Sequence, residues 1–235
     1  MPIYIRVLCL IGMSLIMMNF SPVPAYAEKT KTESPSFSIL AYGDSLVAGY
    51  GLRPDEDFSD QLENRLEASG LSTDVINAGV SGETTAGGLA RLDWTLEGVS
   101  RQPDLVILVL GANDMLRGLP PEQVYDNLDQ ILDRITDKNI PVLLAGMKAP
   151  DNMGQDYVMR FNQIYPRLAD KYKQVELYEF FLQDVAGVAG LNQPDGIHPN
   201  AKGVQKIVKH MAPKVKAILI TADKKTTAPE NNTGD

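Results

Sequence analysis

The chain has 235 residues, of which 44% are hydrophobic and 22% are charged, a composition typical of one globular domain of ordinary size. The formal net charge is −8 and the sequence has no basic stripe, so nucleic acid is disfavoured as a partner. Cys9 is the only cysteine, and it lies in an N-terminal segment that we expect to be removed. A disulfide framework, a cysteine nucleophile and a thiolate metal site are therefore excluded from the expected mature protein.

Residues 1–27 have the pattern of a secretory signal peptide. Arg6 supplies the positive charge, residues 7–18 form an apolar run, and residues 25–27 (AYA) form a small-x-small cleavage site. The alternative, a membrane anchor, is disfavoured because the apolar run is short and polar and proline residues follow from Asn19 onward. We expect a mature chain that begins near Glu28, has no stable membrane anchor, and is periplasmic or secreted. Loss of Arg6 makes its net charge one unit more negative.

Strand and helix patterns alternate after a polar spacer at residues 28–36. In chain order we predict a strand at 37–42, a helix at 58–68, a strand around 75–76, a loop at 77–88, a helix at 89–99, a strand at 105–110, a helix at 122–137, a strand at 141–147, a helix at 156–172, an edge strand at 175–181 and a last helix at 204–220. Residues 105–110 are six consecutive branched apolar residues, which is typical of a central strand covered on both faces.

This alternation predicts an α/β fold: a three-layer, open parallel sheet of about five strands with helices on both faces. We expect one domain at residues 37–220 and a disordered polar tail at 221–235. Ligands bind at the carboxyl ends of the strands in such folds. Ser45, the loop that contains Gly82, and Asn113 each follow a predicted strand, so we expect them to lie along one rim of the sheet.

Asp195 and His198 are the sequence's best candidates for acid–base chemistry. A serine hydroxyl is a weak nucleophile that needs an imidazole to take its proton and a carboxylate to orient that imidazole. Of the two histidines, His210 lies among lysines in a helical pattern and is expected to be a solvated helix residue, whereas His198 lies in a turn-rich loop. The alternative is that Asp195 and His198 only form a turn or capping hydrogen bond before the last helix.

Other interpretations of single residues also stay open. Ser45 could cap a helix, Gly82 could permit a tight turn, and Asn113 could bond its own loop. Asp44 and Asp114 are assigned to loop hydrogen bonds, because the side chain of Asp44 should point away from Ser45 in an extended segment. Residues 43–47 lack the closing glycine of a Gly-x-Ser-x-Gly elbow, and one loop histidine does not make a three-ligand metal set. We expect no metal and no cofactor.

Four ordered stretches resemble the sequence blocks of the SGNH, or GDSL, hydrolase family: residues 43–46 (GDSL), 77–84 (NAGVSGET), 111–114 (GAND) and 195–200 (DGIHPN). Residues 88–92 and 116–118 look like the bacterial subgroup of thioesterase I, lysophospholipase and arylesterase enzymes. The resemblance implies a flavodoxin-like fold with Ser45 as nucleophile, His198 as base and then acid, and Asp195 as the residue that orients His198. It also implies an oxyanion hole formed by the backbone N–H of Ser45, the backbone N–H of Gly82 and the side-chain amide of Asn113.

The same resemblance implies hydrolysis of carboxylic esters and thioesters, with a small-molecule acyl ester, lysophospholipid or aryl ester as substrate. Its acyl groove would be lined by apolar residues near the strand ends, for which the candidates are Met115, Leu116, Leu119, Met147, Ala149 and Pro150; ordinary packing is their alternative role. Two other functions remain open. One is a carbohydrate acetyl esterase, and the other is a binding module whose residues 81–88 cradle a phosphate or cofactor, although they lack both glycine-rich nucleotide motifs.

Overall fold

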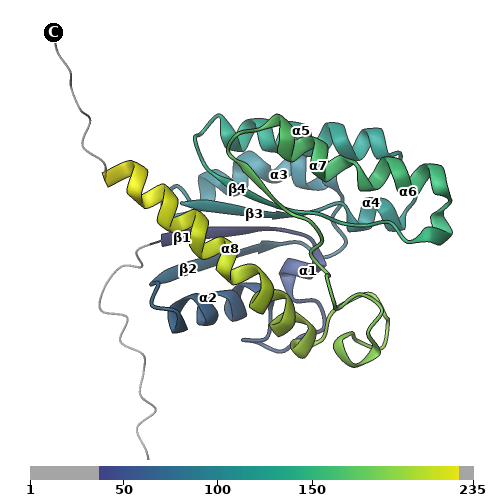
Figure 1. Ribbon diagram of the computed structural model, residues 1–235, viewed down its shortest axis with the longest axis horizontal. Helices are drawn as coiled ribbons and strands as arrows, with labels where there is room; N and C mark the ends of the chain where they lie inside the picture. The colour runs from purple at the N-terminus through teal and green to yellow at the C-terminus, as the bar shows by residue number, and fades with distance from the viewer. Residues whose placement is uncertain (1–36, 228–235) are drawn as a thin grey trace, which may run out of the picture. The chain divides into compact units, whose positions relative to one another are not determined.

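The computed structural model describes residues 37–227 (Figure 1). The predicted signal peptide and spacer, and residues 228–235 of the predicted tail, lie outside the described residues. Within the described part, no helix is both long and apolar enough to cross a membrane.

One parallel sheet of five strands forms the centre of the domain, as the alternating pattern predicts. Its strands are β1 (Phe37–Gly43), β2 (Thr73–Gly79), β3 (Leu105–Val109), β4 (Val142–Ala145) and β5 (Val175–Tyr178), in the spatial order β2-β1-β3-β4-β5. The run at 105–110 does supply the central strand, since β3 is third in this order and all its side chains are fully buried. β5 lies at the edge, also as predicted.

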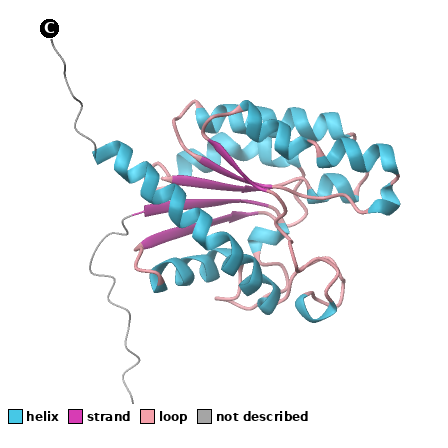
Figure 2. Ribbon diagram, in the orientation of Figure 1, coloured by secondary structure: helices cyan, strands magenta, loops and turns pink. Residues whose placement is uncertain are grey.

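Helices cover both faces of the sheet and give the predicted three layers (Figure 2). α2 (Phe58–Ala68) and α8 (Ala201–Thr227) pack together on one face, and α3 (Thr85–Gly98), α5 (Pro121–Thr136) and α7 (Ile164–Lys171) lie on the other. The remaining helical segments are α1 (Ser45–Ala48), α4 (Ala112–Leu116), α6 (Gln155–Asn162), η1 (Asp151–Met153) and η2 (Ala189–Leu191). The strand order is that of flavodoxin-like sheets.

α5 shows how directly the apolar pattern determines the packing. Its predicted stripe recurs every three or four residues, and all five side chains are fully buried against the sheet: Val124, Leu128, Ile131, Leu132 and Ile135. Pro121 occupies the first turn, where its missing N–H has no partner to lose.

Several predicted boundaries were wrong. The small-residue loop is much shorter than the predicted 77–88, because β2 continues to Gly79. The side chain of Thr84 caps α3, and this helix begins at Thr85, four residues before the predicted start. The single helix predicted at 156–172 is two helices that meet at Gln163. Pro166 explains this break, since it has no N–H to donate to the carbonyl of Asn162 and is tolerated in the first turn of α7.

The chain end also differs from the prediction. α8 begins at Ala201 and continues to Thr227, so residues 221–227, predicted to be part of a disordered tail, are helical. The edge strand β5 is also shorter than predicted: it ends at Tyr178, three residues before the predicted end.

The carboxyl ends of β1, β2 and β3 lie level with one another. Gly43 is in register with Gly79 of β2 and with Val109 of β3. β1 leads to α2 on one face, and β3 leads to α5 on the other, so the two adjacent strands mark the topological switch point where open α/β sheets bind ligands. A Cβ at Gly79 would lie only 2.2 Å from the backbone nitrogen of Ala48, so a glycine is required for α1 to pack on the end of β2.

Candidate active site

Ser45 is held at the switch point by the single turn of α1. Asp44 caps this turn, and its side chain accepts a 3.0 Å hydrogen bond from the N–H of Leu46. Gly49 ends the turn in the left-handed conformation, with φ of 73°. The sequence alternative for Ser45, a helix cap, is wrong because the preceding residue is the cap.

His198 reaches Ser45 across 153 positions of sequence. Its Nε2 lies 2.9 Å from Oγ of Ser45, and its Nδ1 lies 2.7 Å from Oδ2 of Asp195. The other oxygen of Asp195 accepts the backbone N–H groups of Ile197 and His198 at 2.9 and 3.0 Å. The turn predicted for Asp195 and its contact with the ring of His198 occur together, because one carboxylate oxygen makes the turn and the other contacts the ring.

These hydrogen bonds stabilise the ionised form of Asp195. The bond from the His198 ring, followed by the two backbone N–H groups, lowers the pKa of Asp195 to about 2. Asp195 is consequently a carboxylate throughout the neutral range and can accept a hydrogen bond from Nδ1–H of His198. His210, by contrast, lies exposed on α8 with its Nδ1 3.9 Å from Asp184, as expected for a solvated helix residue.

Two residues that the sequence did not indicate hold the histidine loop beside Ser45. The ring of Tyr50 lies over that of His198, with centroids 4.7 Å apart. The side-chain amide of Gln193 donates to the carbonyls of Tyr50 and Pro199 at 2.7 and 3.0 Å. Gln193 thus joins the segment after Ser45 to the loop that carries His198. Its position in a run of turn residues gives no sign of this role.

Gly82 follows β2, and Asn113 follows β3 and lines the same cavity as Ser45. Gly82 has φ of 79° in an exposed turn, and its carbonyl accepts a 2.8 Å bond from Nη2 of Arg117. Nδ2 of Asn113 donates to Oδ2 of Asp44 at 3.2 Å and to the carbonyl of Glu83 at 3.0 Å. Asn113 therefore links the segments that follow β1 and β2, instead of bonding only its own loop.

The two buried aspartates have the loop hydrogen-bonding roles expected of them. Asp114 accepts the backbone N–H and the hydroxyl of Thr85 at 2.9 and 2.6 Å, which ties α4 to the start of α3. Asp44 is fully buried, and this burial raises its pKa to about 6, although the bonds from Leu46 and Asn113 favour the ionised form. Its side chain contacts Asn113 and the N–H of Leu46, and Asp195 is the carboxylate beside His198.

A cavity of 240 Å³ opens next to Ser45 and Asn113. Met115, Leu116, Met147 and Pro150 line it, as predicted. The other wall residues, which sequence reasoning missed, are Leu46, Ala112, Lys148, Phe180, Leu182, Ala186, Gly187, Gly196 and Ile197. Lys148 is the one charged side chain in this lining, and its ammonium lies 5.4 Å from the centre of the Phe180 ring.

Leu119 and Ala149 do not line this cavity, contrary to the prediction. Ala149 is buried and its N–H donates to Oδ1 of Asn162, so it faces α6. The carbonyl of Leu119 accepts the hydroxyl of Tyr157, which fixes that loop away from the site. Successive residues of a loop point in different directions, and nearness to a strand end did not separate Ala149 from Pro150.

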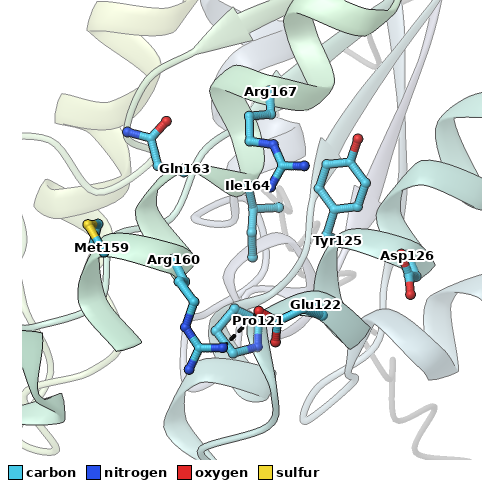
Figure 3. Close-up of a pocket in the computed structure, with 9 residues that line it drawn as sticks. All are labelled: Pro121, Glu122, Tyr125, Asp126, Met159, Arg160, Gln163, Ile164 and Arg167. Atoms are coloured by element: carbon cyan, nitrogen blue, oxygen red, sulfur yellow. Dashed lines mark hydrogen bonds and ion pairs between the residues drawn. The ribbon is translucent and has the colours of Figure 1, made fainter. Parts of the chain in front are cut away.

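A larger hollow of 490 Å³ lies between α5 and α6–α7 (Figure 3). Its floor and rim are formed by Pro121, Glu122, Tyr125, Asp126, Met159, Arg160, Gln163, Ile164 and Arg167. Arg160 pairs with Glu122 across it at 2.8 Å, and Arg167 lies over the ring of Tyr125. None of these nine residues is a serine, cysteine or histidine, whereas the smaller cavity is lined by Ser45. In residues 37–227, no group of three or more His, Cys, Asp and Glu side chains could hold a metal ion.

Known proteins resemble this chain over most of its length. Residues 41–206 match the GDSL-like Lipase/Acylhydrolase family. The chain is 37% identical over 182 residues to esterase TesA of Pseudomonas aeruginosa, which covers 77% of this chain and 89% of that protein. It is 36% identical over 182 residues to thioesterase 1/protease 1/lysophospholipase L1 of Escherichia coli K12, with 77% and 85% covered.

A solved structure agrees with the sequence comparisons. The crystal structure of AlinE4, described as an SGNH-hydrolase family esterase, superposes with a TM-score of 0.68 at 45% identity and covers 79% of this chain and 97% of that one. Fold, sequence blocks and the Ser45–His198–Asp195 geometry point the same way. The chain belongs to the GDSL-like lipase/acylhydrolase family, and it is a serine hydrolase that acts on ester bonds.

Proposed function

We propose that the chain is an exported serine esterase that cleaves carboxylic esters and thioesters through an acyl-enzyme on Ser45. The observation that carries this proposal is the chain of contacts at the cavity mouth, 2.9 Å from Ser45 Oγ to His198 Nε2 and 2.7 Å from His198 Nδ1 to Asp195 Oδ2. Nucleophile, base and orienting carboxylate stand in the required order and within hydrogen-bond distance.

In the first half-reaction, Nε2 of His198 accepts the hydroxyl proton while Oγ of Ser45 bonds to the substrate's carbonyl carbon. Asp195 accepts the hydrogen bond from the Nδ1–H group, remains a carboxylate and stabilises the imidazolium. The imidazolium then returns its proton to the leaving alkoxide or thiolate as the carbon–oxygen or carbon–sulfur bond breaks. In the second half-reaction, water replaces the leaving group, His198 again serves as base, and the acid departs with Ser45 restored.

A negative charge develops on the carbonyl oxygen of the substrate. We assign its stabilisation to three hydrogen-bond donors: the backbone N–H of Ser45, the backbone N–H of Gly82 and the side-chain amide of Asn113. An amide is a neutral donor that titration cannot remove, and donors placed before the charge develops stabilise it most. Nδ2 of Asn113 has two hydrogens, and its bond to Asp44 at 3.2 Å is longer than its bond to Glu83 at 3.0 Å. These two bonds fix the position of the amide at the cavity next to Ser45.

The cavity gives the acyl group an apolar environment. Leu46, Phe180 and Leu182 line it together with the methionines, and no acidic side chain does. This lining supports an acyl ester or a lysophospholipid as substrate, as the names of the two bacterial relatives also do. An acetyl group on a carbohydrate would leave most of the 240 Å³ without contact. A preference for acetyl over octanoyl esters would favour that alternative.

Labelling with a fluorophosphonate followed by peptide mapping tests the nucleophile directly. We expect the label on Ser45 and a fall in kcat on the order of 10⁴-fold or more in both Ser45→Ala and His198→Ala, with the double variant little worse. His210→Ala is the matched control, because it removes the exposed histidine of α8 and should leave kcat unchanged. A label on another residue, or losses that add in the double variant, would contradict the proposed mechanism. Ester binding without turnover that survives Ser45→Ala would favour a binding module.

Export is supported by the pattern of residues 1–27. Expression of the full chain in a Gram-negative host, followed by fractionation and N-terminal sequencing, should recover activity outside the cytoplasm in a chain that begins near Glu28. Retention of an intact N-terminus in the cytoplasm would contradict export without affecting the assignment of Ser45.

A further inference from the structure

Glu83 and Arg91 are largely buried charges that the proposed mechanism does not use. Their side chains are 8% and 19% exposed, and they form a two-pronged ion pair in which Nε of Arg91 lies 2.8 and 2.9 Å from the two oxygens of Glu83. Burying a charge is unfavourable unless a partner and further hydrogen bonds compensate it. Because Glu83 directly follows Gly82, the buried pair adjoins one of the assigned oxyanion donors, and a role at the active site would explain its burial.

Arg91 contacts the ends of two strands as well as Glu83. Nη2 donates to the carbonyl of Gly43 at 3.2 Å and to that of Ala78 at 2.9 Å, and the guanidinium lies 4.0 Å from the centre of the Tyr42 ring. Gly43 is the last residue of β1 and precedes the Asp44–Ser45 pair. The planar fork of an arginine can reach a carboxylate and carbonyls at once, which a lysine cannot do.

Glu83 contacts the other side of the site through its backbone. Its carbonyl accepts Nδ2 of Asn113 at 3.0 Å, and its N–H closes the turn around Gly82 by donating to the carbonyl of Val80 at 3.2 Å. The N–H of Val80 donates in turn to the carbonyl of Gly43 at 2.9 Å, the same oxygen that Arg91 contacts. Asn113 completes the circuit through its bond to Asp44.

We propose that Arg91 and Glu83 are positioning residues that set the geometry of the oxyanion hole. This inference rests on the proposed function and deepens it. The hydrogen bonds form a closed ring from Gly43–Asp44 to Asn113, to Glu83, to Arg91 and back to Gly43. The three assigned oxyanion donors are all attached to this ring: Ser45 follows Asp44, Gly82 precedes Glu83, and Asn113 is a member.

Breaking the ring displaces donors without removing them. Loss of the guanidinium would leave the buried carboxylate of Glu83 without its partner. The side chain would then move toward water and would displace the backbone carbonyl of Glu83, which accepts the hydrogen bond from Asn113. Misplacement of a catalytic group by about 1 Å can lower a rate on the order of 100-fold. Neither Glu83 nor Arg91 lines the cavity of Leu46, Phe180 and Leu182 to which the acyl chain is assigned, so ground-state binding should change little.

The test compares Arg91→Gln, Glu83→Gln and the double variant with the exposed pair of Figure 3, Arg160→Gln and Glu122→Gln. We expect kcat to fall on the order of ten- to a hundredfold in each variant of the buried pair, with KM within about threefold of wild type. The double variant should be no worse than the single ones, because both disrupt one ring. The control pair, which is exposed and remote, should leave kcat unchanged.

Two further measurements separate positioning from general stability. In an Asn113→Ala background, Arg91→Gln should lower kcat by less than about threefold, since the loss of Asn113 has already opened the ring that positions the donors. Arg91→Lys keeps the charge but not the fork, so it should recover the midpoint of thermal unfolding without recovering kcat. Full recovery of kcat by lysine, or an undiminished effect of Arg91→Gln without Asn113, would overturn the inference.

The outcome is distinguishable from failure of the proposed function. Fluorophosphonate labelling of the wild-type enzyme reports on Ser45 alone. If Ser45 is labelled and Arg91→Gln retains wild-type kcat while remaining folded, the positioning role is wrong and the esterase mechanism stands.

Discussion

Substitution of Ala186 by phenylalanine should shorten the acyl chain that the enzyme prefers. Ala186 lines the cavity beside Ser45 yet is exposed, so a larger side chain can extend into the cavity without displacing the hydrophobic core. A phenyl ring would occupy much of the 240 Å³ otherwise open to substrate. Only the space for the acyl chain should change, because the methyl side chain of Ala186 makes no hydrogen bond to Ser45 or His198.

The expected size of the effect follows from burial of methylene groups. Each methylene that enters an apolar site contributes about 0.8 kcal/mol, which is about a fourfold gain in kcat/KM. Four additional methylenes, from acetyl to hexanoyl, could therefore raise kcat/KM by up to about 250-fold in the wild type. The cavity is partly open to water, so this figure is an upper limit. In Ala186→Phe the ratio of hexanoyl to acetyl turnover should approach one.

Steady-state kinetics with p-nitrophenyl esters of two to twelve carbons measure this ratio. Ala90→Phe is the matched control, since it introduces the same side chain at an exposed position of α3 outside the cavity lining. Acetyl turnover should stay within about threefold of wild type in both variants. An unchanged slope with chain length in Ala186→Phe would refute the placement of the acyl chain in this cavity, and an equal loss at every length would indicate damage to the catalytic residues.

Two further predictions concern the residues that hold the site together. Burial raises the pKa of Asp44 to about 6 from 3.8, so the folded protein binds this proton more tightly than the unfolded chain does, and about 3 kcal/mol of stability that is fully present below pH 3.8 should be lost as the pH rises through 6. Denaturant unfolding should show this pH slope in the wild type and not in Asp44→Asn; equal slopes would contradict it. Gln193→Leu removes the two bonds between the Ser45 and His198 segments and should lower kcat about tenfold and stability by about 1–2 kcal/mol. Gln102→Leu, which removes one exposed bond to Lys138, is its control and should retain kcat; an equal kcat in both variants would show that Gln193 does not hold His198 in place.

The parts of the fold that the sequence predicts are those governed by local periodicity. The apolar run at 105–110 indicates a central strand because a strand buried on both faces has no polar side, and β3 is that strand. The stripe of α5 repeats with the helical period, and its five residues are all buried. The break between α6 and α7 was missed because the apolar pattern continues through Gln163, and only the backbone chemistry of Pro166 interrupts it.

The residues of the candidate site also fall into two groups, those that the sequence indicates and those that it does not. A lone loop histidine three residues after an aspartate is visible in the sequence, and the structure brings both side chains to Ser45. Gln193 and Tyr50 were not visible because their interaction joins residues 143 positions apart through a backbone carbonyl, and carbonyls carry no sequence signal. The cavity walls Phe180, Leu182 and Ala186 were missed because they follow β5 in a segment without regular structure, where periodicity gives no direction to a side chain.

The assembly of the site also explains why so many charges are buried at one end of the sheet. Asp44 accepts a hydrogen bond from Asn113 of α4, and Asp114 and Glu83 accept hydrogen bonds from Thr85 and Arg91 of α3. A buried polar group without a partner is strongly destabilising, so a shift of these loops that breaks one of these bonds is costly. An apolar packing of the same loops would tolerate small shifts. The polar network tolerates few, and that rigidity holds oxyanion donors in place before any charge develops on the substrate.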